Sequence, residues 1–81
     1  MKVKRNLAIS ESGFLFNPST GDSFSVNPIG QDIIKGLKDG LSESEIQDSL
    51  FDKYDANKST LEKDFYDFIN QLKNYKLLEN E

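Results

Sequence analysis

Short apolar stretches separated by turn-forming residues make up the first third of the chain. Three segments have this character: residues 3–10, 14–16 and 22–26. In the third segment, Phe24 and Val26 share one side, toward the expected core, and serines occupy the other side. This period of two is typical of a strand with one buried face. The pattern therefore predicts three strands, of which the second and third form a hairpin around the turn-forming residues between them.

From residue 27 onward, apolar residues recur every three or four positions, as they do in amphipathic helices. Asn27 followed by Pro28 is a typical helix start, and Gly40 is a typical helix end. Ser42 and Glu45 have the spacing of a capping box, in which each side chain bonds the other residue's backbone N–H. These signals predict a first helix up to residue 40 and a second helix directly after it.

A third helix is predicted to begin at a second capping box, formed by Ser59 and Glu62, and to run to about Tyr75. On a helical wheel, Phe68 and Ile69 flank its apolar stripe on opposite sides, so one flank can be left open as a groove. The residues of the stripe are Leu61, Phe65, Phe68, Ile69 and Leu72. Most of the stripe is expected to lie in the core.

Strands that precede helices predict an α+β domain, here a winged-helix-like arrangement with a three-stranded antiparallel sheet followed by three helices. With 81 residues, the chain is expected to form a single domain over residues 1–81. A sheet this small has open edges, where backbone N–H and C=O groups are unpaired.

The composition argues against an enzyme. The chain has no histidine and no cysteine, and its 14 acidic residues lie mainly on the polar faces of the predicted helices. Acid/base chemistry needs carboxylates that converge on one site. The acidic run at residues 52–57 also lacks the glycine and the closing glutamate of a calcium-binding loop. We therefore predict no catalytic residue, no metal site and no cofactor.

Charge and hydropathy limit the partners and the location. The net charge is −4 and Arg5 is the only arginine, which disfavours binding to nucleic acid. No apolar run is long enough to span a membrane, and the basic start lacks the apolar stretch of a signal peptide. We expect a cytoplasmic protein without a membrane partner. Two alternatives stay open: a winged-helix DNA-binding transcriptional regulator, and an interaction domain detached from a larger maturase.

Residues 15–78 resemble the PqqD-like family of peptide chaperones, also called the recognition elements of ribosomally made and modified peptides (RiPPs). The resemblance consists of an ordered set of short motifs, none of which is specific alone. In chain order the motifs are Asn17-Pro18-Ser19-Thr20-Gly21, Val26-Asn27-Pro28-Ile29-Gly30, Ile33 and Leu37 with Asp39-Gly40, Ser42-Glu43-Ser44-Glu45-Ile46, Leu50-Phe51-Asp52-Lys53-Tyr54, and Asp64-Phe65 with Phe68, Leu72 and Leu77-Leu78.

The resemblance implies that the leader region of a precursor peptide binds as an added strand on the third strand, residues 22–26. The groove between this strand and the third helix would take the leader's apolar side chains. A modifying enzyme, such as a radical SAM maturase, would then receive the peptide. The residues implied in peptide binding are Asp22, Ser23, Phe24, Ser25, Val26, Phe65, Phe68, Ile69, Leu72 and Lys73. We expect Val26→Pro to abolish leader binding, because proline lacks the backbone donor of a sheet.

Overall fold

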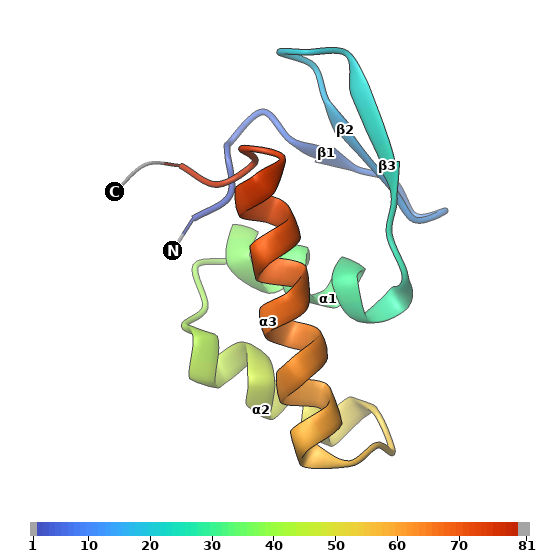
Figure 1. The fold of residues 1–81 in the computed structure, drawn as a ribbon, viewed down its shortest axis with the longest axis vertical. Helices are drawn as coiled ribbons and strands as arrows, with labels where there is room; N and C mark the ends of the chain where they lie inside the picture. The colour runs from blue at the N-terminus through green and yellow to red at the C-terminus, as the bar shows by residue number, and fades with distance from the viewer. Residues whose placement is uncertain (1, 80–81) are drawn as a thin grey trace.

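The computed structural model describes residues 2–79 and consists of a three-stranded antiparallel sheet followed by three helices (Figure 1). In chain order the elements are β1 (Ala8–Ile9), β2 (Phe14–Asn17), β3 (Asp22–Ser25), α1 (Pro28–Lys38), α2 (Glu43–Lys53) and α3 (Lys58–Asn74). The spatial order of the strands is β1-β2-β3, so β3 lies at an edge of the sheet. The predicted α+β fold class is confirmed.

The hairpin of β2 and β3 forms as the turn residues predict. The carbonyl oxygen of Asn17 accepts hydrogen bonds from the backbone N–H groups of Thr20 at 3.2 Å and Gly21 at 2.8 Å. Gly21 has a φ of +80°, a conformation that residues with a side chain rarely adopt. The Asn17 side chain is buried and accepts a bond from the Ser19 N–H, which fixes the turn further.

The predicted first strand, residues 3–10, is wrong over most of its length. Residues 5–6 form a turn, and only Ala8–Ile9 pair with β2. Val3 instead forms an isolated antiparallel bridge with Leu78, and Lys4 N–H donates to the Leu77 carbonyl at 2.9 Å. The buried Val3 therefore pairs with the C-terminal segment, a partner that no local pattern reveals.

Capping residues explain where the first two helices begin. The Asn27 side-chain oxygen accepts from Gly30 N–H at 2.8 Å, and Pro28 occupies the first turn of α1, where its missing N–H costs nothing. Both bonds of the capping box between Ser42 and Glu45 are present at the start of α2. Both predicted starts are confirmed.

The start of α3 differs from the prediction. Asn57 caps this helix, and its side-chain oxygen accepts from Ser59 N–H at 2.9 Å. Ser59 therefore lies inside the helix, and the predicted capping box between Ser59 and Glu62 is wrong. An asparagine two positions earlier offers the same kind of acceptor, and the helix gains a further half turn by using it.

The core lies between the three helices and the inner face of the sheet. Figure 1 shows α3 running through the centre of the molecule, with α1 behind it in this view and the sheet beside its C-terminal half. The largest fully buried side chain is Phe65 of α3, and a side-chain carbon at Gly36 of α1 would lie 2.8 Å from Ile46 of α2. Glycine thus allows α1 and α2 to pack closely.

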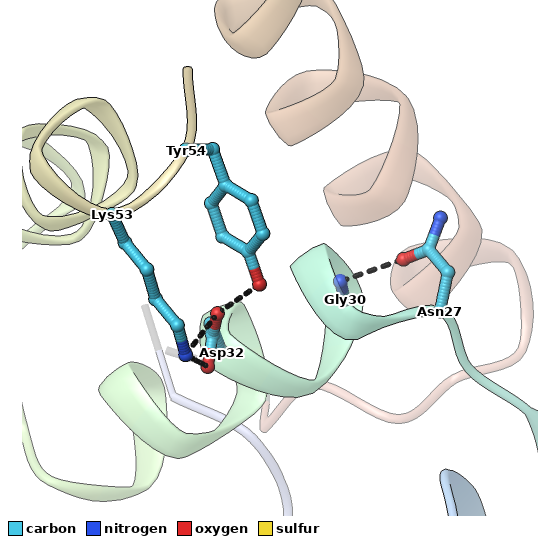
Figure 2. A network of polar contacts seen from close by, with 5 residues as sticks. All are labelled: Asn27, Gly30, Asp32, Lys53 and Tyr54. Atoms are coloured by element: carbon cyan, nitrogen blue, oxygen red, sulfur yellow. Dashed lines mark hydrogen bonds and ion pairs between the residues drawn. The ribbon is translucent and has the colours of Figure 1, made fainter. Parts of the chain in front are cut away.

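A polar network joins α1 to the end of α2 (Figure 2). The Asp32 carboxylate accepts from Tyr54 Oη at 2.5 Å and pairs with Lys53 Nζ at 3.1 Å. Partial burial alone would raise the pKa of Asp32, but the hydrogen bonds from Tyr54 and Lys53 outweigh this effect and lower the pKa. Burial and the bond to Asp32 raise the pKa of Tyr54 to about 12. The network fixes the position of α1 relative to α2.

Candidate peptide-binding groove

The edge strand β3 has one side paired with β2 and the other side free. At its end, Val26 N–H donates to the Gly13 carbonyl at 2.7 Å, so the backbone of Val26 belongs to the domain's own ladder. Backbone groups in an antiparallel strand point alternately to its two sides. This alternation directs the N–H and C=O groups of Ser23 and Ser25 toward the free edge.

Val26→Pro was expected to abolish leader binding by removing a backbone donor from the free edge, and this reason is wrong. The donor that the substitution removes is already bonded to Gly13. Ser25 is the position at which proline would remove a donor from the free edge and leave the internal ladder intact.

An apolar hollow of about 230 Å³ lies between β3 and the C-terminal half of α3. We call it the groove. The helix contributes residues one turn apart, and the sheet contributes the side of β3 that faces inward. The lining residues are Leu15, Phe24, Ser25, Val26, Phe68, Gln71, Leu72, Tyr75 and Leu77.

An aromatic pair connects the two walls of the groove. The rings of Phe24 and Tyr75 have centroids 4.5 Å apart with an interplanar angle of 37°. Phe24 is half-buried, whereas Tyr75 is 54% exposed. The pair is accessible from solvent, so an apolar side chain that enters the groove can pack against either ring.

A second hollow of about 150 Å³ adjoins the groove and lies between the start of α1 and α3. It shares Phe68 and Gln71 with the groove, and Asp64 is its charged lining residue. A side-chain carbon at Gly30 would lie 2.5 Å from Val26 Cγ1 and 2.8 Å from Phe68 Cε1. Glycine is therefore required at this point for the wall between the two hollows to keep its shape.

The cap of α1 holds the junction between β3 and α1 in place. Figure 2 shows the Asn27 side chain turned toward the backbone of Gly30. Gln31 Nε2 also donates to the Val26 carbonyl at 3.1 Å. These bonds tie the end of β3 to the first turn of α1, so the strand edge and the groove keep a fixed relative position.

The structure brings together some of the residues implied in peptide binding and separates others. Phe24, Ser25, Val26, Phe68 and Leu72 line the groove, and the exposed Asp22 and Ser23 lie on the same edge strand. Phe65 and Ile69 are buried in the core and do not line it, and Lys73 is exposed outside it. Of the two flanks of the α3 stripe, the side of Phe68 faces the groove.

Four lining residues were not predicted from the sequence: Leu15, Gln71, Tyr75 and Leu77. Gln71 and Tyr75 lie three and seven positions after Phe68, on the same face of the helix. Continuing the face of Phe68 for two more turns would therefore have predicted both residues. Leu77 lies beyond the end of α3 and reaches the groove because the chain turns back after Lys76, which has a φ of +59°. No sequence signal marks that return.

Two features are absent from the part of the chain that the structure describes. Within residues 2–79, no group of three or more potential metal ligands comes together. None of the helices formed by these residues combines the length and the hydrophobicity needed to cross a lipid bilayer.

Comparisons with known proteins identify a family and two similar solved structures. Residues 13–78 match the family described as coenzyme PQQ synthesis protein D (PqqD). One similar solved structure, of TbiB1 in complex with the TbiA(beta) leader peptide, has 30% sequence identity, a TM-score of 0.85, and coverage of 100% of this chain and 98% of that chain.

A lasso peptide synthetase B1 complexed with the leader peptide has 20% identity, a TM-score of 0.80, and coverage of 98% of this chain and 96% of that chain; at this identity it supports the fold alone. No curated protein sequence matches the chain. The family match spans most of the chain and includes both walls of the groove, and the chain belongs to the PqqD family.

Proposed function

We propose that this chain binds the leader region of a precursor peptide as an added strand on β3 and presents the peptide to a modifying enzyme. The observation that carries the proposal is the position of a free strand edge directly beside an apolar groove. Main-chain hydrogen bonds along an edge give affinity, and pockets for alternate side chains give specificity.

The geometry of the edge suits an added strand. The outward backbone groups of Ser23 and Ser25 offer two donors and two acceptors to a partner strand. The side chains of both serines are small, so they leave room for a peptide backbone about 4.8 Å away. Every second side chain of the peptide would point to the inner side of the sheet, where the groove lies.

The chain contributes binding and leaves the chemistry to its partner enzyme. The resemblance in sequence favours a radical SAM maturase as that enzyme. The leader peptide in the 30% identical TbiB1 structure supports the first half of the proposal, the binding of a leader. A cytoplasmic location fits a partner that is made on the ribosome.

A titration followed by NMR tests the proposal. The ¹⁵N-labelled chain is mixed with a synthetic leader peptide from any precursor gene that neighbours its own gene. We expect amide shifts in residues 22–26 and 68–75, and slower hydrogen exchange at Ser23 and Ser25 than in the free protein. Val26 should change little in exchange, because its N–H is already bonded.

Two outcomes would overturn the proposal. The first is a set of shifts that avoids both β3 and α3, because a leader bound elsewhere does not extend this sheet. The second is tight, salt-sensitive binding of duplex DNA by the same sample without any response to the leader. That result would favour a DNA-binding regulator.

A further inference from the structure

The outer face of the sheet carries two exposed phenylalanines. Phe14 and Phe16 of β2 point away from the helices and are 51% and 42% exposed, whereas the residue between them is buried. Their neighbours across the sheet are small: Phe14 pairs with Ser25, and Phe16 pairs with Ser23 and with Ala8. No large side chain on the paired strands therefore covers either ring. We call this surface the outer aromatic face.

Exposed aromatic rings at these positions depart from the usual pattern of a sheet with one solvated face. Outward positions in such a sheet are ordinarily polar, as the serines of β3 are. About half of each ring stays in water, so folding removes only about half of the apolar area of the two rings from solvent. Aromatic side chains are enriched at protein–protein interfaces relative to the rest of a protein's surface, which makes this face a candidate contact surface.

The area of the outer aromatic face indicates what kind of partner covers it. The exposed fractions of the two rings together equal roughly one whole phenylalanine side chain, about 150–250 Å². A stable interface buries about 800 Å² on each partner. Two copies of the chain that met through these rings alone would bury too little to remain together, so the partner must also contact a neighbouring surface.

We propose that the outer aromatic face and the bound leader together form the docking surface for the modifying enzyme. This inference rests on the proposed function, because a leader strand on β3 extends the same sheet. Its alternate side chains then lie on the same face as Phe14 and Phe16. The enzyme meets the complete surface only when the leader is in place, so it distinguishes the loaded chain from the empty one.

The experiment compares a double variant, Phe14→Ser with Phe16→Ser, with the control variant Tyr66→Ser. Tyr66 is 47% exposed on α3 and does not line the groove, so the control removes a similar exposed ring from another surface. The maturation enzyme encoded beside the chain's gene is immobilised, and each variant is passed over it with and without the synthetic leader peptide. Leader affinity is measured separately by calorimetry, and circular dichroism verifies the fold.

We expect the leader to increase the affinity of the wild-type chain for the enzyme. The double variant should bind the leader within twofold of wild type, yet bind the enzyme at least tenfold more weakly in the presence of the leader. The control should match wild type in both measurements. Equal enzyme affinity of the double variant and wild type would overturn the proposal, as would a wild type that fails to bind the enzyme.

Two further results would overturn it for distinguishable reasons. A wild type that does not bind the leader contradicts the proposed function itself, and calorimetry detects this without the enzyme. A wild-type dimer in analytical ultracentrifugation that the double variant loses would assign the outer aromatic face to a second copy of the chain.

Discussion

Proline substitution at Ser25, the last residue of β3, and at Val26, which follows it, gives opposite predictions, because the backbone donors of the two residues point in opposite directions. Ser25 N–H faces the free edge, whereas Val26 N–H is bonded to Gly13 at 2.7 Å. Proline is tolerated in an edge strand where the missing N–H faces solvent. We therefore expect Ser25→Pro to remain folded and to lose leader affinity.

The magnitudes follow from the bonds involved. Ser25→Pro leaves a leader carbonyl without its donor, which costs about 1–3 kcal/mol, or roughly a 5- to 150-fold loss of affinity. Its stability should change by less than about 1 kcal/mol. Val26→Pro breaks a bond inside the sheet and should lower the free energy of unfolding by about 1–3 kcal/mol. That loss is large for a chain of this length, whose total stability is about 4–12 kcal/mol.

Calorimetric titration with the leader peptide and urea unfolding measure the two effects separately. Ser25→Ala is the matched control, because it keeps the backbone N–H and should bind the leader within about twofold of wild type. The reasoning is refuted if a folded Ser25→Pro binds the leader as tightly as wild type. A loss of binding in Val26→Pro at unchanged stability would show that the donors alternate in the opposite register.

Three further predictions concern the walls of the groove and the polar network. Gly30→Ala should weaken leader binding in a titration, because its new side-chain carbon would displace Phe68. Gly36→Ala should instead lower the free energy of unfolding in urea by about 1–3 kcal/mol, because its side-chain carbon crowds the core, and should leave leader affinity unchanged. Phe68→Ala should lower leader affinity about tenfold or more by removing the wall that both hollows share, and equal affinity would exclude this residue from the site. Tyr54→Phe should cost about 1 kcal/mol at neutral pH, since Asp32 loses a donor. The pKa of the Asp32 carboxyl is lower in the folded than in the unfolded protein, so the ionised carboxylate stabilises the fold. This stabilisation is present above the ordinary pKa of 3.8 and is lost as the pH falls through the pKa of Asp32 in the folded protein. The difference between wild type and Tyr54→Phe should therefore shrink in urea unfolding at about pH 3, and a difference independent of pH would contradict the role of the carboxylate.

Local signals predicted the parts of the fold that local interactions create. The helix starts at Asn27 and Ser42 depend on bonds between residues three positions apart, so the sequence pattern contains both partners. The first strand could not be predicted in the same way, because Val3 pairs with Leu78 at the other end of the chain. Hydrophobic spacing showed that residues 3–10 bury side chains, but it could not show against which segment.

The site was predictable in outline and not in detail. Periodicity placed Phe65, Phe68 and Ile69 on one stripe, and only the position of the sheet decides which flank remains open. The direction of the backbone donors of β3 was also hidden, because it depends on the register with β2. Leu77 lines the groove because the chain turns at Lys76, and a lysine does not indicate a turn with a positive φ.

The bridge between Val3 and Leu78 has a consequence for the order in which the protein folds. The hairpin and the helices form through contacts between residues close in the sequence. The bridge instead closes a loop of nearly the whole chain, and contacts between residues so far apart in the sequence form more slowly. Glu79 N–H donates to the Lys2 carbonyl at 2.8 Å, and Lys4 N–H holds the carbonyl of Leu77. Leu77 lines the groove and is held twice, by its own N–H, which donates to the Leu72 carbonyl at 2.9 Å, and by the segment of the bridge. A chain still emerging from the ribosome therefore lacks the finished groove until residue 77 is available.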